Sequence, residues 1–424
     1  MLLENVRGAY AFNSNVGIPF AILHYMKIMQ LFTASVKITL LVICFVSCCY
    51  PVVLWADQGT MREERSPAIL GLVWTVPTIY KNNNNPYFQS FSLVGRYHGQ
   101  YWSAESEGNK DDGWENRRFY VGFNTQLFKQ FIVEVQISIN DDFDPVYEGL
   151  YDAFVKWENS EKNFSISTGR LDYVYTGMER STSSKKIKTM ERALLVNQVM
   201  PGEVVGIYAT GENGDLSYQT GVFSGSIEDE FTSFEGGFGV LLGFAYKAPL
   251  FYDKGTLHFD YLFNNGNEDN NAFKDYENII SLWHEGQKGA LAIGFDLTAA
   301  SGIGDQSDVF GITLLPSYDL AHNLIINADT LQVALRYHYA SSKESHGLNF
   351  NKRYEQKVAS GKGDSYNSVY LGLNYLIYQQ KLKLMAGLEY FDMAGVEGND
   401  DDTSIAGKRS VDGWNFITGV RLYF

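Results

Sequence analysis

Cations and hydroxyl groups gather in one short stretch of this chain, the segment from Gly177 to Arg192. Its sequence, GMERSTSSKKIKTMER, places three lysines and a run of hydroxyl side chains between two arginines, and Arg170 lies just upstream: Arg180, Ser181, Thr182, Ser183, Ser184, Lys185, Lys186, Lys188 and Arg192. Such groups bind oxyanions through charge-assisted hydrogen bonds. The segment therefore predicts an anion-binding site. The alternative is a solvated exterior loop whose lysines contact lipopolysaccharide.

No constellation for catalysis accompanies this segment. The chain has seven histidines, but none shows the spacing of metal ligands. Neither a serine nucleophile elbow nor a phosphate-cradling glycine loop precedes a helix. We therefore expect no enzyme activity, no catalytic residue, no metal site and no cofactor, and we keep a His/Ser barrel lipase as the alternative.

Composition points to an all-β protein. The 424 residues include 28 Tyr, 28 Phe and 40 Gly, and few stretches have the periodicity of a helix, a combination typical of sheet proteins. Acidic residues outnumber basic ones, 49 to 34, for a net charge of −15. That balance argues against a nucleic-acid partner, because nucleic-acid binders usually carry a basic footprint.

The front of the chain resembles an export signal. Lys27 and Lys37 precede an apolar stretch, and Ala56 precedes Asp57, which predicts a signal peptide cleaved after Ala56. We expect residues 1–25 to be a non-native upstream extension, 26–56 the signal peptide, 57–87 a periplasmic N-terminal segment and 88–424 the main domain. The alternatives are a membrane-spanning helix and a lipoprotein site at Cys48 or Cys49.

The main domain alternates apolar and polar residues in segments of ~10 residues, the pattern of membrane-barrel strands. Phe131, Val133 and Val135, for example, alternate with Ile132 and Glu134. Sixteen such segments are expected, at 88–102, 115–127, 130–140, 148–158, 163–171, 203–210, 215–224, 236–248, 255–263, 276–285, 288–298, 309–317, 328–341, 364–378, 381–392 and 411–424. The connections alternate between short turns and long polar loops, apart from 318–327, which is longer than a turn should be.

These features predict a 16-stranded antiparallel transmembrane β-barrel with an inward-folded third long loop, Asp172 to Gly202. A loop of this length in a compact fold is usually functional or disordered. The last strand ends in Phe424 and resembles the assembly signal of outer-membrane barrels, so we expect a bacterial outer-membrane location. The alternative is a soluble β-sandwich or β-solenoid that happens to end in Phe.

From Arg117 to about Ser226 the chain resembles the phosphate-selective porin O/P family. The matching pieces, in order, are RRFYVGFNTQLF, LYDAFVKW, SISTGR, TSSKKIKTMERAL and GDLSYQTGVFSGS. The resemblance implies a trimeric porin with an anion site at a constriction formed by the inward third loop. It also implies the residues of that site: Arg117, Arg118, Asp152, Arg180, Ser183, Ser184 and Arg192. Arg180 stands where the family has Lys, so a planar fork replaces a point donor.

Strand parity adds an orientation for two of these residues. If Phe119 and Val121 face lipid, Arg118 faces the lumen. In the same way, if Tyr151 and Ala153 face lipid, Asp152 faces the lumen. Four further cations, Arg336, Lys381, Lys383 and Arg421, could form a basic track or pair with luminal acids.

Acidic loops depart from the family pattern, because a negative mouth repels anions. They include Glu105, Glu107, Asp111, Asp112, Glu228, Asp229, Glu230, Asp400, Asp401 and Asp402. We interpret them as groups that contact lipopolysaccharide through divalent cations. Small anions such as phosphate, outer-membrane lipid and lipopolysaccharide, and further copies of the chain in a homotrimer are the expected partners. The alternatives are a general low-selectivity porin and a structural or adhesive barrel.

Overall fold

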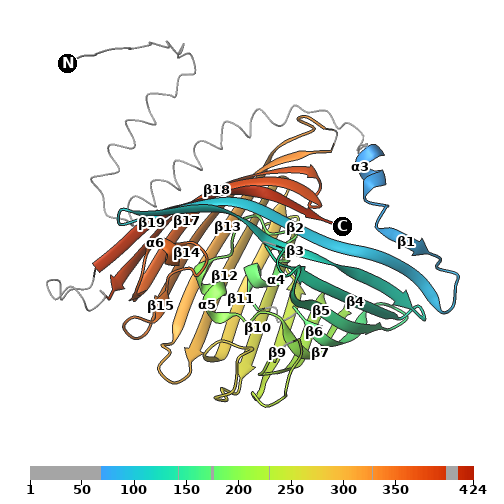
Figure 1. The fold of residues 1–424 in the computed structure, drawn as a ribbon, viewed down its shortest axis with the longest axis horizontal. Helices are drawn as coiled ribbons and strands as arrows, with labels where there is room; N and C mark the ends of the chain where they lie inside the picture. Colours follow the sequence, from blue (N-terminus) through green and yellow to red (C-terminus); the bar gives the residue numbers. More distant parts are fainter. Residues whose placement is uncertain (1–67, 142, 173–175, 229, 327, 398–408) are drawn as a thin grey trace, which may run out of the picture. The chain divides into compact units, whose positions relative to one another are not determined.

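The computed structural model describes residues 68–424 except 142, 173–175, 229, 327 and 398–408 (Figure 1). The predicted upstream extension and signal peptide, as well as Asp229 and Asp400 to Asp402, lie outside the described residues. The described chain begins with a short helix, α3 (Ala68–Val73), and a short strand, β1 (Thr78–Lys81). No helix in the described part of the chain is both long and apolar enough to cross a membrane.

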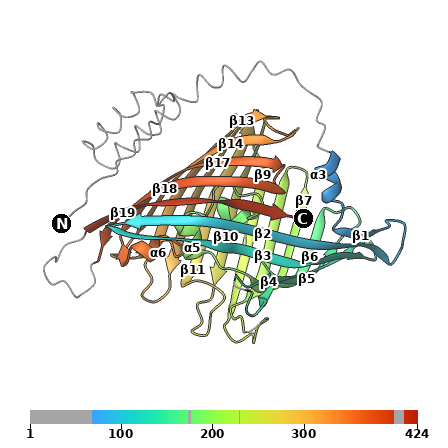
Figure 2. The same cartoon turned by 45° about the horizontal axis from the view of Figure 1, so that its top comes forward.

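Sixteen antiparallel strands of the described chain form a closed ring (Figures 1 and 2). They are β2 (Phe88–Ser106), β3 (Asn109–Leu127), β4 (Phe131–Ile139), β5 (Tyr147–Glu158), β6 (Phe164–Leu171), β7 (Val204–Asn213), β8 (Leu216–Ser224), β9 (Phe238–Lys247), β10 (Lys254–Asn264), β11 (Tyr276–Lys288), β12 (Leu291–Gly302), β13 (Val309–His322), β14 (Thr330–Ser342), β17 (Ser365–Tyr378), β18 (Leu382–Val396) and β19 (Arg409–Tyr423). Each pairs with its neighbours in sequence order, and β19 pairs with β2 to close the ring. The predicted fold class is confirmed.

Side chains alternate across the wall as the sequence predicts. In β19, Trp414 and Phe416 are exposed on the outer face, whereas Asn415 and Ile417 are buried inside. Because the ring is closed, the backbone groups of neighbouring strands bond to each other wherever the strands are paired, as a wall in lipid requires. The outer face is therefore apolar, whereas the inner face carries both polar and apolar side chains.

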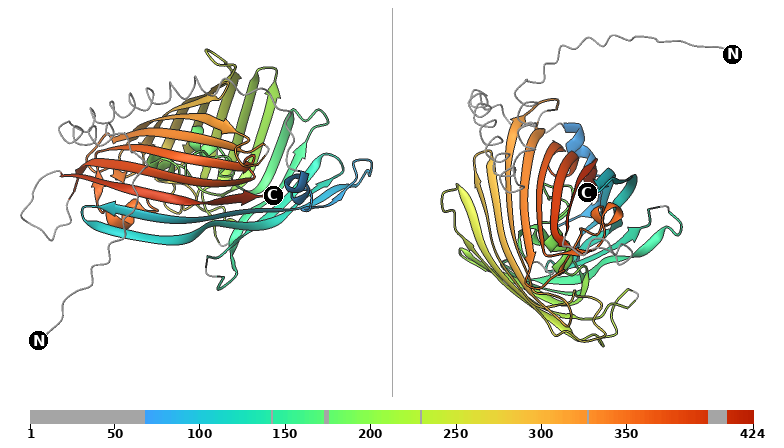
Figure 3. Two further views of the ribbon diagram at one scale, coloured as in Figure 1. Left: turned by 90° about the horizontal axis from the view of Figure 1, so that it is seen from above. Right: turned by 90° about the vertical axis from the view of Figure 1, so that its left-hand side faces the viewer.

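The wall is uneven in height on one side (Figure 3). β2 and β3 are 19 residues long, whereas β4 has 9 and β6 has 8. Pairing between β3 and β4 starts only at Tyr120, opposite Ser138. The part of β3 before Tyr120 therefore extends beyond β4, while it stays paired with β2.

Two β-bulges lie at the level of the predicted anion site. In β3 the partner of His98 is Arg118 and that of Gly99 is Asn116, so Arg117 is the extra residue. In β5 the partner of Gln136 is Asp152 and that of Ile137 is Leu150, which leaves Tyr151 unpaired. A bulge redirects a side chain that strict alternation would send to the other face. The prediction that Tyr151 faces lipid is wrong for this reason, since its hydroxyl donates to Asp172 at 2.7 Å.

Two connections on the long-loop side contact the inner wall. The first follows β6 and contains α4 (Met178–Ser181) and α5 (Leu194–Val199). The second follows β14 and contains β15 (Leu348–Asn349), α6 (Glu355–Val358) and β16 (Lys362–Gly363). We call them the first and the second inserted segments, residues 172–203 and 343–364.

Wall glycines make room for the first inserted segment. A Cβ on Gly294 of β12 would lie 2.1 Å from the sulfur of Met178, and one on Gly311 of β13 would lie 2.5 Å from Leu195. Either distance is far below van der Waals contact. The segment therefore packs against β12 and β13 at positions where any side chain would collide with it.

One carboxylate orders the turn between β13 and β14, the connection whose expected length was unusual for a turn. Asp329 accepts hydrogen bonds from the backbone amides of Leu324, Ile325 and Ile326 at 2.6–2.8 Å. Burial favours the neutral acid, but these amides and the Tyr375 hydroxyl lower the pKa of Asp329 below its usual range. The expected start of this connection at residue 318 is wrong, because β13 continues to His322 and β14 begins at Thr330.

Candidate functional site

A cavity of about 270 Å³ lies between the first inserted segment and the bulged wall of β3 and β5. Its lining combines arginines, two tyrosines and a few apolar residues: Arg117, Arg118, Tyr120, Tyr151, Asp172, Arg180, Ser184, Arg192, Val196, Asn197, Met200, Pro201, Gly202, Glu203 and Lys274. We call it the arginine pocket. Five of the seven predicted site residues line it.

The bulge in β3 gives its two arginines different tasks. Arg117 forms an ion pair with Glu191 of the first inserted segment, with Nε 2.9 Å from Oε1 and Nη2 3.3 Å from Oε2. Arg118 lines the pocket, and within the described residues its guanidinium has neither an ion pair nor a hydrogen bond. Arg117 therefore holds the segment, whereas Arg118 is available to a solute.

Arg180 and Arg192 approach the pocket from the segment itself. Arg180 pairs with Asp172 and donates to the carbonyl of Gly202 at 3.2 Å. Among the described residues, the guanidinium of Arg192 donates to two carbonyls and to no carboxylate, to Glu179 O at 2.8 Å and to Thr182 O at 3.0 Å. These carbonyls orient the guanidinium without neutralising its charge.

Of the three other predicted site residues, one lines the pocket and two lie outside its lining. Ser184 lines the pocket, where its hydroxyl accepts a hydrogen bond from Arg96 at 2.7 Å. Ser183 lies outside the lining and accepts from the amide of Lys185 at 3.4 Å, a turn contact. Asp152 also lies outside it, and its carboxylate accepts from the backbone amide of Asp172 at 3.3 Å. Asp152 therefore supports the segment from behind.

Positive charge exceeds negative charge in the lining. Arg117, Arg118, Arg180, Arg192 and Lys274 face only two acids there, Asp172 and Glu203. Burial lowers the pKa of Arg192, and the neighbouring Arg180 lowers it further, as expected for clustered like charges. Arginine nonetheless stays charged in proteins. The pocket thus holds a net positive charge that an anion would stabilise.

Burial raises the pKa of Glu203, and the nearby Asp172 raises it further. Glu191, outside the lining, behaves in the opposite way: burial favours its neutral form, yet Arg117 and Arg353 lower its pKa far below the usual range. Glu191 therefore stays ionised as the partner of Arg117, whereas Glu203 more readily loses its charge.

Three of the four further cations predicted in the lumen contact the first inserted segment, whereas the ammonium of Lys381 lies 6.0 Å from the centroid of the Tyr378 ring. Arg336 of β14 bonds to Glu179 and to the carbonyl of Glu191, each at 2.8 Å. Lys383 of β18 donates to the carbonyl of Ile187 at 2.9 Å, and Arg421 of β19 donates to that of Met190. Pairing with luminal acids is therefore found for Arg336, whereas Lys383 and Arg421 donate to backbone carbonyls of the segment.

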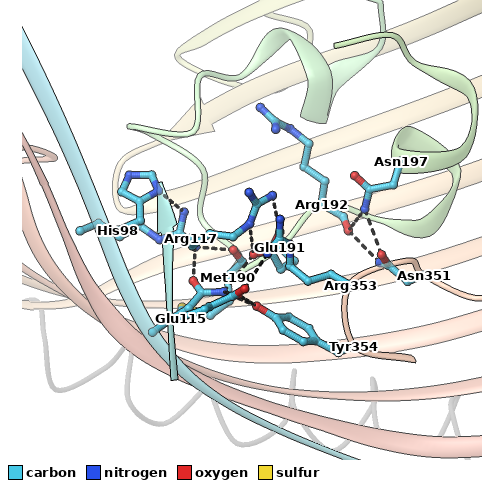
Figure 4. Close-up of polar contacts among 12 residues, drawn as sticks. His98, Glu115, Arg117, Met190, Glu191, Arg192, Asn197, Asn351, Arg353 and Tyr354 are labelled. Atoms are coloured by element: carbon cyan, nitrogen blue, oxygen red, sulfur yellow. Dashed lines mark hydrogen bonds and ion pairs between the residues drawn. The ribbon is translucent and has the colours of Figure 1, made fainter. Parts of the chain in front are cut away.

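The second inserted segment, which we had not expected, packs against the first (Figure 4). Asn351 accepts a hydrogen bond from Asn197 at 3.2 Å and contacts the carbonyl of Arg192 at 3.5 Å. Arg353 pairs with Glu115 of β3 at 2.6 Å. The length of the 342–363 connection was the only sequence signal for this arrangement, and nothing in its composition distinguished it from an outer loop.

Another cavity, of about 440 Å³, lies on the short-turn side of the first inserted segment. Ser181 lines it together with Lys156, Lys162, His258 and Asp260. Its neighbour Arg180 lines the arginine pocket. Two adjacent residues of the segment, Arg180 and Ser181, thus line two different cavities.

Comparisons with known proteins agree with this architecture. The sequence matches the family described as beta-barrel porin-2, OmpL-like, over residues 116–413. Comparison with curated proteins finds no match. The solved structure of Pseudomonas putida OprB is similar with a TM-score of 0.53 at 10% identity, covering 79% of this chain and 94% of that one.

Two further solved structures match more weakly. DcaP of Acinetobacter baumannii has a TM-score of 0.47 at 10% identity, over 81% of this chain and 99% of that chain. A loop-deletion mutant of Vibrio cholerae OmpT has a TM-score of 0.49 at 13% identity, over 79% and 99%. At these identities the likeness to OprB concerns the fold alone.

Proposed function

The chain belongs to the OmpL-like beta-barrel porin-2 family of outer-membrane barrels, and from this premise we propose that it is a porin for the passive diffusion of small anions, of the phosphate type, through the arginine pocket. The observation that carries the proposal is the pair Arg118 and Arg192. Both guanidinium groups line the pocket, and within the described residues no carboxylate pairs with either.

The pocket offers a passing anion substitutes for its water. Guanidinium forks of Arg118 and Arg192 bind oxyanions in a planar, bidentate manner, and the hydroxyl of Ser184 adds a further polar group. Conduction also requires that the solute leave again. Asp172 and Glu203 in the same lining reduce the net positive charge, so binding is weak enough for release.

The fixed position of the first inserted segment favours the interpretation that it forms a permanent constriction. The alternative is that it is a passive surface loop. Four wall strands contact it, through Arg117 of β3, Arg336 of β14, Lys383 of β18 and Arg421 of β19. A segment tied in this way presents its arginines at constant positions. Such preorganisation lowers the cost of binding because few side chains must be ordered when the solute arrives.

The experiment is a planar-bilayer measurement on the protein as it exists. A reversal potential in a KCl gradient gives the ratio of chloride to potassium permeability, and added phosphate tests for block of the chloride current. The proposal expects an anion-selective pore with phosphate block. A cation-selective pore would contradict it, and anion selectivity without phosphate block would limit the proposal to chloride-like ions.

A general low-selectivity porin is the second candidate, favoured by acids at the rim of the β2–β3 hairpin. Glu105, Glu107, Asp111 and Asp112 are held there, with Glu107 paired to Arg409 at 2.8 Å. In that case the inserted segments would set only the size limit. A permeability ratio near one, unchanged by substitutions in the arginine pocket, would favour this candidate.

We also propose that copies of the chain associate as a homotrimer. The free side of β3 before Tyr120 supports this, because no described strand pairs with it there. An uncovered strand edge is a template for pairing with another chain. Light scattering of the detergent-solubilised protein, corrected for bound detergent, tests the proposal, and a monomeric mass would contradict it.

A further inference from the structure

We propose that the arginine pocket selects organic oxyanions, with a carboxylate or phosphomonoester head on a small apolar or aromatic body, over bare inorganic phosphate. The inference rests on the proposed permeation of anions and names the solute class of the same site. It comes from the part of the lining that a bare oxyanion would leave unused.

One wall of the pocket is aromatic. The rings of Tyr120 and Tyr151 stack with their centroids 3.9 Å apart and 19° between their planes, and both residues line the pocket. The Arg96 guanidinium lies 5.3 Å from the Tyr120 centroid and 5.5 Å from that of Tyr151. Cation–π contacts of this kind stabilise the pair. The aromatic wall is thus preformed.

The inserted segment adds aliphatic surface. Val196 of α5 lines the same pocket together with Met200 and Pro201, which follow this helix. Each Å² of apolar surface that a ligand covers stabilises the bound state by about 25 cal/mol. A phosphate ion is hydrated on all sides and gains nothing from such contacts. An apolar body attached to the oxyanion would cover them.

The size of the pocket favours the same class. About 270 Å³ corresponds to roughly nine waters at about 30 Å³ each. A phosphate ion would occupy a small part of that space and leave water against Val196 and Met200. A ring or a short chain behind the anionic head would fill the pocket and displace this water.

The head group is recognised mainly by guanidinium. Four of the five cations in the lining are arginines, with Lys274 as the exception. Planar forks fit carboxylates and phosphate monoesters alike, because both present two oxygens in a plane. The shared chemistry is therefore an oxyanion head, and the two sources are separated by experiment.

Block of the chloride current in planar bilayers is the test, with four probes added separately at equal concentration: acetate, benzoate, inorganic phosphate and phenyl phosphate. We expect benzoate to block about five-fold more strongly than acetate, and phenyl phosphate about five-fold more strongly than inorganic phosphate. The comparison between benzoate and phenyl phosphate tells which head the pocket prefers. Equal block within each pair would overturn the inference.

Variants assign the preference to this pocket. Val196→Thr keeps the shape of the side chain but makes it polar, and Tyr120→Leu removes one ring. Each should reduce the benzoate-to-acetate ratio at least two-fold. Val76→Thr, in the exposed segment before β1, is the matched control and should leave the ratio unchanged. An undiminished ratio in both pocket variants would overturn the inference.

The outcomes also separate this inference from the proposed function. A pore that is anion-selective but binds inorganic and organic oxyanions equally contradicts the inference and leaves anion permeation intact. A cation-selective pore contradicts the proposed function itself, whatever the order of the four probes. The wild-type measurements alone decide both points, so the test stands even if a variant fails to assemble.

Discussion

The guanidinium of Arg336 lies 2.8 Å from the carboxylate of Glu179, and this contact joins the wall strand β14 to the first inserted segment. A second carboxylate, Glu389 of β18, lies 2.8 Å from the same guanidinium. Arg336 has no exposed surface, and both acids are buried. One arginine therefore couples the position of the first inserted segment to the stability of the wall.

Replacing Arg336 by Met should destabilise the barrel and widen the pore. Removing one partner of a buried ion pair leaves uncompensated charge, at a cost of about 3–5 kcal/mol. We expect a lower thermal midpoint in detergent and a larger single-channel conductance, because Glu179 then loses its partner on the wall.

The matched control is Arg409→Met, which breaks the partly exposed pair with Glu107. Such surface pairs contribute about 0–1 kcal/mol. Unchanged conductance in Arg336→Met, or equal destabilisation by the two substitutions, would show that Arg336 does not position the segment.

Gly294→Ala should displace the start of α4. The added Cβ would lie 2.1 Å from the Met178 sulfur, so the inserted segment must move or the side chain must rotate away. We expect noisier current and an altered conductance in single-channel recordings. The double variant Gly294→Ala with Met178→Ala should restore the wild-type conductance, since the colliding atoms are gone.

Gly149→Ala serves as the control for this experiment, because a Cβ at Gly149 meets no atom within 4 Å. If Gly294→Ala and Gly149→Ala have the same conductance as the wild type, the contact between Met178 and β12 does not hold the segment.

Alkaline pH should weaken the attachment of α6. Burial raises the pKa of Glu355 to about 8, and the neighbouring Glu389 adds to the shift. The folded state therefore keeps a proton that the unfolded state releases near pH 4.3. Stability associated with Glu355 is full below about pH 4.3 and decreases as the pH rises through 8.

Thermal midpoints measured in detergent between pH 6 and 9 test this sign. Because Glu355→Gln stays neutral, its thermal midpoint should rise relative to that of the wild type as the pH increases. This difference should level off above pH 8. A difference between variant and wild type that is constant across this range would contradict the assignment.

The sequence predicted the strands well because a membrane barrel imposes a strict two-residue period on every wall segment. Most of the predicted boundaries of the sixteen strands fall within a few residues of those observed. Arg118 could be oriented by the same parity. Parity fails at Arg117 and Tyr151, because a bulge adds one residue without any change in composition.

Contacts between segments far apart in the chain could not be predicted from the sequence either. The second inserted segment meets the first through Asn197 and Asn351, which are 154 positions apart, and neither residue type indicates an inward course. The sequence predicts Arg336 and Arg421 as luminal cations, but it does not identify their partners in the first inserted segment. Periodicity defines faces within a strand, but it carries no information on which loop fills the lumen.

An anion pathway through the arginine pocket requires the charges of Arg118 and Arg192, and the reversal potential in a KCl gradient tests this requirement most directly. We predict that wild-type protein and Lys343→Ala, which removes an exposed loop cation, are equally anion-selective. The double variant Arg118→Gln with Arg192→Gln should lose most of that selectivity while keeping a conducting pore. Cation selectivity in the wild type, or an unchanged reversal potential in the double variant, would contradict an anion pathway through the arginine pocket.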